Sequence, residues 1–193
     1  MTDDTKYYGK YRGVVLNNLD PLQTGRLLVQ VTDITGLLTS SWAMPCVPIG
    51  GIQMGMYAIP PVGSGVWIEF EQGDPDYPVW VGCFWGTAVE VPTLARMVPP
   101  PVPGITLQTP LQNGLTISDV PGPTGGIMLK STSGATIIVN DTGIIIQNGK
   151  GASIMLTGPT VNIVGNPVSI TAGGALNVVG SPVNVNAGAL VVT

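Results

Sequence analysis

The amino-acid sequence predicts an all-β protein built from two different regions. The 193 residues include 27 Gly and 18 Pro, which favour tight turns and weaken helices. Hydrophobic residues make up 44% of the chain, enough to build a core in each region. Ionisable side chains are concentrated in the first 90 residues, whereas residues 120–193 contain only Lys130, Asp141 and Lys150. This uneven charge indicates that the two regions are organised differently.

The first region alternates apolar and polar residues as half-buried strands do. Turn residues such as Asp20-Pro21 and Gly50-Gly51 separate the alternating segments. Five short strands within about 75 residues are typical of a small closed barrel of the OB-fold type. We therefore expect a short N-terminal arm followed by an OB-fold domain. The arm is residues 1–10, the domain is residues 11–87, and the expected strands are residues 11–17, 25–33, 42–49, 65–73 and 78–86.

A proline-rich segment follows the predicted barrel. Residues 98–104 read VPPPVPG, and consecutive prolines fix the backbone in an extended polyproline II conformation. We therefore expect a stiff connector, which we place over residues 88–125.

Short apolar segments then recur every seven to nine residues from about residue 126, separated by Gly, Asn, Ser, Asp or Pro. The end of the chain repeats openly, because VNIVGNPVSITAGGA (161–175) is similar to LNVVGSPVNVNAGA (176–189). A repeated unit of two strands and two turns indicates a solenoid or a prism. One such ribbon has an apolar face that it cannot cover by itself, so it needs partner chains.

Three copies around a threefold axis would cover that face. We expect residues 126–193 to form an intertwined trimeric β-helix, or β-prism, in which alternate residues face the axis. The outward residues between them, such as Asn162, Ser169, Asn177 and Asn184, need no counter-ion. The expected trimer-core residues are Val161, Ile163, Val168, Ile170, Leu176, Val178, Val183 and Val185.

Three motifs in the first region carry a family resemblance. They are NNLDPLQTGR at residues 17–26, PPVGSGVWIEF at residues 60–70 and GDPDYPV at residues 73–79. In this order, and followed by an uncharged repetitive tail, they resemble the central spike proteins of contractile phage tails and related injection machines, including the VgrG proteins of type VI secretion. The absence of any large domain between barrel and tail is similar to the short spikes of phages P2 and Mu.

The resemblance implies a homotrimeric needle with its OB domains around the axis. It implies that the OB end docks on the hub and tube proteins of a baseplate, and that the needle contacts the target membrane transiently. Short spikes end in a metal-binding His-x-His apex, but this chain has no histidine, so we expect no bound metal. A separate PAAR-like tip protein is expected instead on the residues at the C-terminal end, Ala189, Leu190, Val191, Val192 and Thr193.

The predicted function is therefore a structural spike that caps the tube and punctures the target envelope. The start, MTDDTKYYGK, has no apolar signal region, so we expect synthesis in the cytoplasm and incorporation into a phage tail or a contractile injection particle. The alternative is a trimeric carbohydrate-binding adhesin with an OB head and a β-stalk. In that case Trp42, Trp67, Trp80 and Trp85 would form a glycan platform rather than pack in cores or between protomers. A nucleic-acid partner is not expected, because the net charge is −4 and only 9% of residues are charged.

The sequence does not predict an enzyme. Without histidine, no serine or cysteine has an obvious base beside it, and we expect no cofactor and no catalytic residue.

Asp74 and Asp76 flank a proline, which favours an Asx turn over a cation site. The segment GIIIQNGKG at 143–151 lacks the spacing of a phosphate-binding loop. Asn140-Asp141-Thr142 fits the glycosylation pattern but is better explained as a turn. Cys46 and Cys83 lie in apolar surroundings and are expected to be small buried hydrophobes, before a disulfide or a metal pair.

Overall fold

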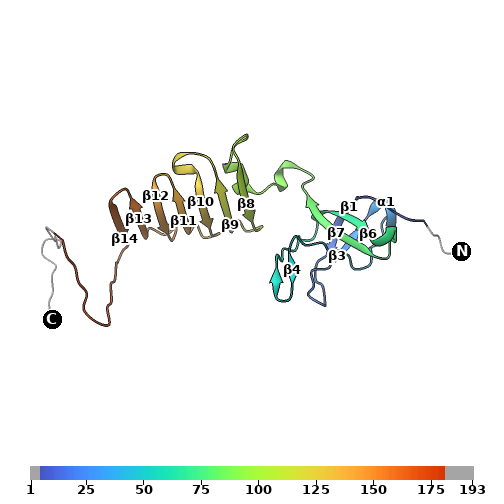
Figure 1. Cartoon of the computed structure of the whole chain (residues 1–193), viewed down its shortest axis with the longest axis horizontal. Coiled ribbons are helices and arrows are strands. Elements are labelled where there is room, and N and C mark those ends of the chain that lie inside the picture. The colour runs from blue at the N-terminus through green and yellow to red at the C-terminus, as the bar shows by residue number, and fades with distance from the viewer. Residues whose placement is uncertain (1–4, 181–193) are drawn as a thin grey trace. The chain divides into compact units, whose positions relative to one another are not determined.

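The computed structural model of the chain describes residues 5–180. The chain divides into two compact units, Met1–Val91 and Pro92–Thr193. Regular structure is almost entirely strand, and the one α-helix of the described part is the single turn α1 (Thr32–Thr35) (Figure 1). The predicted all-β class is confirmed. Across residues 5–180 no helix has the length and apolar character needed to span a bilayer.

The first unit is a five-stranded barrel. Its strands are β1 (Tyr11–Asn17), β2 (Leu28–Gln30), β3 (Met44–Pro45), β6 (Gly65–Phe70) and β7 (Pro78–Phe84), in the spatial order β2-β1-β6-β7-β3. Neighbouring strands are antiparallel except β3 and β7, which are parallel. Leu27 and Ala43 close the barrel, because the N–H of each donates to the carbonyl oxygen of the other at 3.1 and 2.8 Å. The predicted OB-type barrel is therefore present.

The barrel core consists of the inward residues of these strands. Val15, Val29, Val66 and Ile68 are completely buried, as the period-two alternation predicts. Trp80 closes the core and donates from Nε1 to the Gly25 carbonyl oxygen at 3.0 Å. Buried tryptophan N–H groups need such a partner, so this bond fixes the ring in place.

Four of the five barrel strands are shorter than predicted: β6 ends at Phe70 and β7 at Phe84, and β2 and β3 are shortened most. The expected strand at 25–33 is reduced to β2, because the Arg26 N–H donates to the Asp20 carboxylate rather than to a neighbouring strand. The expected strand at 42–49 is reduced to β3, since Pro45 and Pro48 have no N–H to donate. A small hairpin follows β3 and is formed by β4 (Gly50–Gly51) and β5 (Met54–Gly55).

The expectation for the cysteines is wrong. Cys46 and Cys83 are both exposed and unpaired. Cys46 follows the last residue of β3 and Cys83 is next to last in β7, so both lie outside the core cluster. Their apolar neighbours in the sequence belong to strand ends rather than to the barrel interior.

The described part of the N-terminal arm lies on its own barrel. The Tyr7 N–H donates to the Gly73 carbonyl oxygen at 2.8 Å, and the Tyr7 ring lies 6.3 Å from the Phe70 ring, centroid to centroid. Lys10 Nζ lies 2.6 Å from a carboxylate oxygen of Glu69. Residues 5–10 are therefore anchored to the strand β6 and the turn that follows it.

The second unit is a seven-stranded antiparallel sheet whose strands follow one another in sequence order (Figure 1). Each strand has five residues. The strands are β8 (Gly104–Gln108), β9 (Gly114–Ser118), β10 (Gly126–Lys130), β11 (Thr136–Asn140), β12 (Gly143–Gln147), β13 (Ser153–Thr157) and β14 (Thr160–Val164). Connections of five residues at 109–113, 131–135 and 148–152 alternate with the connections 119–125, 141–142 and 158–159.

The sheet begins earlier than the expected boundary at residue 126. β8 and β9 lie within the segment 88–125, which was expected to be a connector, so the proline-rich stretch ends at Gly104. A short 3-10 helix, Thr93–Met97, precedes the sheet and buries Leu94 against it. Residues 165–180, which carry the rest of the first open repeat and the start of the second, form no strand in the single chain.

Candidate functional site

The seven-stranded sheet has one face made only of aliphatic side chains. The second and fourth residues of every strand point to this face, because successive side chains of a strand alternate between faces. All fourteen are Ile, Leu or Val. We call this set the aliphatic face: Ile105, Leu107, Leu115, Ile117, Ile127, Leu129, Ile137, Val139, Ile144, Ile146, Ile154, Leu156, Val161 and Ile163.

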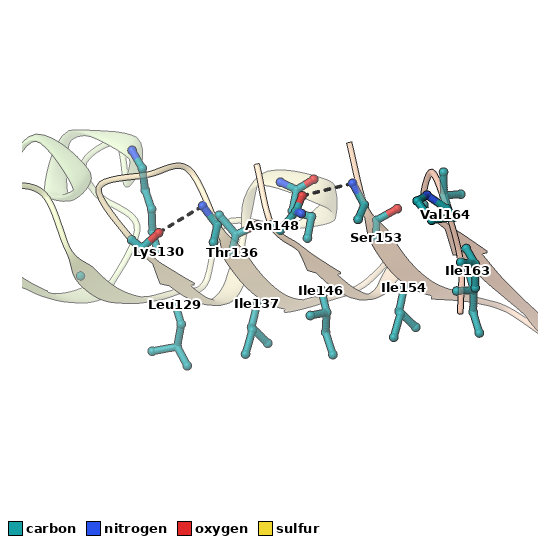
Figure 2. Close-up of a pocket in the computed structure, with 18 residues that line it drawn as sticks. Leu129, Lys130, Thr136, Ile137, Ile146, Asn148, Ser153, Ile154, Ile163 and Val164 are labelled. Atoms are coloured by element: carbon teal, nitrogen blue, oxygen red, sulfur yellow. Dashed lines mark hydrogen bonds between the residues drawn. The ribbon is translucent and has the colours of Figure 1, made fainter. Parts of the chain in front are cut away.

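Strand register arranges the aliphatic face into two continuous rows. Ile137 lies opposite Leu129 on one side and Ile146 on the other, and Ile154 lies opposite Ile146 and Ile163. Figure 2 shows Leu129, Ile137, Ile146 and Ile154 projecting from the same side of the sheet. A register slip of one residue would place these side chains on the other face, so the continuity of the rows fixes the pairing.

The aliphatic face is largely uncovered in the single chain. Thirteen of its fourteen side chains are exposed by between 38% and 62%, with Val161 the most exposed, and Leu115 is half-buried. A contiguous apolar patch of this extent exceeds what soluble monomers usually expose, and such patches mark interaction sites. The face is therefore the strongest candidate for a binding surface in the second unit.

One row of the aliphatic face borders an open hollow of about 720 Å³. Ile146 and Ile154 line it, together with Val168 from the segment after β14. Ligand sites combine apolar walls with a few converging polar groups. Here the polar groups, including Lys130, come from the strand ends and the connections between them, and Lys130 and Asn148 lie on the opposite side from the row in Figure 2. The hollow therefore fits an apolar protein surface better than a small molecule.

The opposite face of the sheet is different in composition and is partly covered by its own chain. Its middle positions include Thr116, Met128 and Ile145, and its outer positions are Gly, Ser, Thr, Asn, Gln, Lys and one Val. The segment before β8 covers the first strands, because the Leu94 N–H donates to Gln108 Oε1 at 2.9 Å and the Leu94 side chain is only 2% exposed. The aliphatic face has no such cover within residues 5–180.

Glycines at the first position of two strands let neighbouring strands approach closely. Gly126 and Gly143 begin β10 and β12, and a Cβ added at these positions would lie 2.1 Å from the Val139 carbonyl oxygen and 2.0 Å from that of Leu156. Both glycines have positive φ, +81° and +149°. The first residues of β10, β12 and β14 follow each other at intervals of 17 residues, so the sheet is a structural repeat that starts well before residue 161.

The structure brings together only part of the predicted trimer-core set. Val161 and Ile163 lie on the aliphatic face beside β13. Val168, Ile170, Leu176 and Val178 are exposed by 50 to 67% and belong to no strand. Val183, Val185 and the expected tip-binding residues 189–193 lie outside the described residues. The eight aliphatic-face residues between 127 and 156 lie in the segment whose alternate residues were expected to face the axis, although none of them was named. Sequence reasoning missed the four in β8 and β9, which the pattern Gly-apolar-x-apolar at 104 and 114 would have indicated.

The turn predictions for the polar motifs hold. The Asp76 N–H donates to Asp74 Oδ1 at 3.0 Å, which is an Asx turn. The Thr142 N–H donates to Asn140 Oδ1 at 2.9 Å. Asn148 Oδ1 accepts from the N–H groups of Lys150 and Ala152. Each motif is therefore accounted for by local backbone hydrogen bonds.

The four tryptophans have separate environments. Trp80 is in the core, and the Trp67 and Phe84 rings lie 5.0 Å apart, centroid to centroid. The guanidinium carbon of Arg26 lies 5.2 Å from the Trp42 ring centroid. Trp85 is 63% exposed. This separation does not favour a shared glycan platform. Among residues 5–180 no group of three or more potential metal ligands occurs.

The motif at residues 17–26 builds a buried charge site. The Asp20 side chain is 3% exposed and accepts hydrogen bonds from Leu22, from Thr24 and from the backbone and guanidinium of Arg26. The Arg26 guanidinium, helped by the Leu22 and Thr24 bonds, holds the pKa of Asp20 well below its usual range, although burial opposes this. The motif therefore stabilises the turn between β1 and β2 and leaves no free carboxylate for chemistry.

Comparison with known families assigns both units. Residues 11–85 match the family described as the type VI secretion system/phage-baseplate injector OB domain. Residues 104–166 match the phage baseplate V C-terminal trimerisation domain. The first match spans the barrel strands and the second spans β8–β14, including the whole aliphatic face. No curated protein matched the chain in a sequence search.

Proposed function

The chain belongs to the phage baseplate V and VgrG-like spike proteins of contractile injection machines, and on this premise we propose that three copies form a needle that caps the tube and punctures the target envelope. The family assignment makes the protein a structural component of a baseplate and a homotrimer.

The aliphatic face is the observation that carries the proposal. Three sheets that turn this face toward a common axis would remove its fourteen side chains from water, each square ångström of apolar surface contributing about 25 cal/mol. The opposite face suits the outside, because its outer positions are mainly small or polar and its first strands are already covered by residues 93–97. Val161 and Ile163 would then continue the trimer core, with Val168, Ile170, Leu176, Val178, Val183 and Val185 beyond them.

A needle must transmit force without unfolding. Every strand from β9 to β13 is paired on both sides, so separating one strand requires two ladders of hydrogen bonds to break together. Residues 151–193 contain no charged side chain, and charged groups at bilayer depth are expensive. Both properties support entry of this end into a target membrane.

The remaining partners are proposed from the family resemblance. The OB end would join the hub and tube proteins of the baseplate, within a phage tail or a contractile injection particle. The C-terminal residues 189–193 would hold a separate PAAR-like tip protein. The role is mechanical and includes no catalytic step.

The solution mass of the purified chain tests the proposal first. Light scattering is expected to give three times the protomer mass of 19.9 kDa. Particles assembled with a chain truncated after Val179 should then keep the trimer but lose the tip protein. A stable monomer would contradict the needle. Tryptophan fluorescence that changes on titration with sugars would favour the adhesin alternative.

A further inference from the structure

The first unit exposes two apolar patches that residues 5–180 do not cover. The first, the hairpin patch, is formed by side chains of β4, β5 and the residues beside them. Ile52 at its tip is 98% exposed, Met54 is 65% exposed, Ile49 is 57% exposed and Met56 is 49% exposed. The hairpin is nevertheless regular, because Gly50 pairs with Gly55 and the Met56 N–H donates to the Ile49 carbonyl oxygen at 3.1 Å.

The hairpin patch lies in a long charge-free stretch. No Asp, Glu, Lys or Arg occurs from residue 34 to residue 68. Exposed hairpins usually carry charged side chains that keep them soluble and apart from other chains. An ordered hairpin with an uncharged aliphatic tip is typical of a segment that is buried by a partner.

The second patch, the barrel patch, lies on the outer side of β1 and β6. Val14 is 44% exposed and Leu16 is 39% exposed. Beside them, the Arg12 guanidinium carbon lies 5.6 Å from the Trp67 ring centroid and 5.3 Å from that of Phe84. Trp and Arg dominate the binding energy of protein interfaces, and the stacked guanidinium keeps its N–H donors available.

The two patches lie on different sides of the barrel. The hairpin leaves the barrel from β3, whose neighbours are β7 and, through Ala43 and Leu27, the start of β2. β1 is not adjacent to β3, since β2 separates them in one direction and β6 and β7 in the other. A closed ring of three identical subunits requires this arrangement, because each subunit contacts its two neighbours through two different surfaces.

We propose that the hairpin patch of one protomer docks on the barrel patch of the next protomer around the threefold axis. The inference rests on the trimer of the proposed function and adds a contact that the trimerisation domain does not contain. Trimerisation through residues 104–166 tethers three barrels together, which raises their local concentration and favours this contact over an external partner.

The chemistry of the two patches is complementary. The hairpin brings aliphatic side chains and uncharged backbone, and the barrel patch offers Val14, Leu16 and the Trp67 ring. Within residues 5–180 no carboxylate lies within ion-pair distance of Arg12. Its guanidinium can therefore donate to carbonyl oxygens of the docked hairpin.

Cysteine cross-linking of the full chain tests the contact. In a Cys46→Ser, Cys83→Ser background, Ile52→Cys and Val14→Cys are introduced singly and together, and the trimer is oxidised. The double variant should give covalent trimers on a non-reducing denaturing gel, at least tenfold above either single variant, because position 52 meets position 14 and not another position 52. The matched control pairs Ile52→Cys with Tyr77→Cys, which is exposed outside both patches and should not cross-link.

The outcomes separate the inference from the proposed function. A trimeric mass with no cross-link above the controls overturns the contact and leaves the needle intact. Cross-linked dimers from Ile52→Cys alone overturn it as well, since they require a symmetric contact. As a second measurement, a maleimide should label Ile52→Cys at least tenfold more slowly than Tyr77→Cys in the trimer, and equal rates would overturn the contact, because the hairpin would then be exposed. A monomeric mass overturns both proposals.

Discussion

Arg26 donates two hydrogen bonds to one oxygen of Asp20, from Nε at 3.0 Å and from Nη2 at 2.6 Å. The other Asp20 oxygen accepts from Thr24 and from the Arg26 backbone. The guanidinium also lies over the Trp42 ring. This buried pair joins the turn after β1 to the start of β2, where the barrel closes, so its charge state is coupled to folding of the first unit.

Replacement of Asp20 by Asn should destabilise the barrel and alter its response to acid. The folded protein lowers the pKa of Asp20, so the ionised carboxylate contributes stability above its ordinary pKa of about 3.9 and loses that contribution as the pH falls below it. At pH 7 we expect D20N to lower the thermal unfolding midpoint by at least several degrees. Between pH 5 and pH 2 the wild-type midpoint should fall more steeply than that of D20N.

Asp33→Asn is the matched control for this experiment. Asp33 is exposed on α1, so its replacement should leave both the midpoint at pH 7 and the acid slope close to those of the wild type. Parallel acid slopes for D20N and the wild type would contradict the role assigned to the buried pair.

Gly143→Ala should lower the stability of the sheet by more than the cost of backbone strain alone. The new Cβ would meet the Leu156 carbonyl oxygen, so β12 and β13 must separate, at a cost of about 1–3 kcal/mol. Gly158→Ala is the control, because Gly158 has a φ of +55° but open space around it. Left-handed strain alone costs about 1–2 kcal/mol there. Chemical unfolding of the two variants separates clash from strain, and a smaller loss for Gly143→Ala would show that the edge tolerates a side chain.

Leu94→Ala should loosen the beginning of the sheet. The Leu94 side chain is 2% exposed and its Cδ1 occupies the place where a side chain at Gly114 would lie, 2.5 Å from that Cβ. Truncation of a buried leucine costs about 2–5 kcal/mol. Hydrogen exchange should show faster opening of β8 and β9. Leu111→Ala, at a 71% exposed loop position, should leave exchange unchanged, and equal effects would mean that residues 93–97 do not hold the sheet.

Strands with clear alternation were predictable from the sequence. β1 and β6 alternate inward and outward residues along their whole length, and β7 does so up to Trp80, where its pairing with β6 becomes irregular, so their positions follow from the pattern. β2 and β3 are shorter than predicted, because alternation does not reveal where a backbone N–H is taken by a carboxylate or is absent at a proline. β8 and β9 were hidden between two proline-rich stretches, although GITLQ and GLTIS have the same alternation as the later strands.

The candidate surface was predictable only in part. The apolar alternation indicated Val161 and Ile163, but the register that joins them to Ile154 and Leu156 depends on hydrogen-bonded pairs that the sequence does not state. Residues 168–171 and 176–179 alternate similarly and form no strand in the single chain. A strand needs a neighbour, and alternation alone does not identify the chain that supplies it.

Neighbouring residues of β12 test which face of the sheet points to the trimer axis. Ile146 lies on the aliphatic face, whereas Ile145 points to the opposite side of the same strand. Ile146→Asp would bury an unpaired carboxylate in each protomer, which costs several kcal/mol per ion. We therefore expect this variant to be monomeric by light scattering at micromolar concentration, with its strand content by circular dichroism retained. Ile145→Asp makes the same charge change on the face that points away from the proposed axis and should remain trimeric. The opposite result, a trimer for Ile146→Asp and a monomer for Ile145→Asp, would show that the other face of the sheet points to the axis. Met128 and Met155 would then lie at the axis.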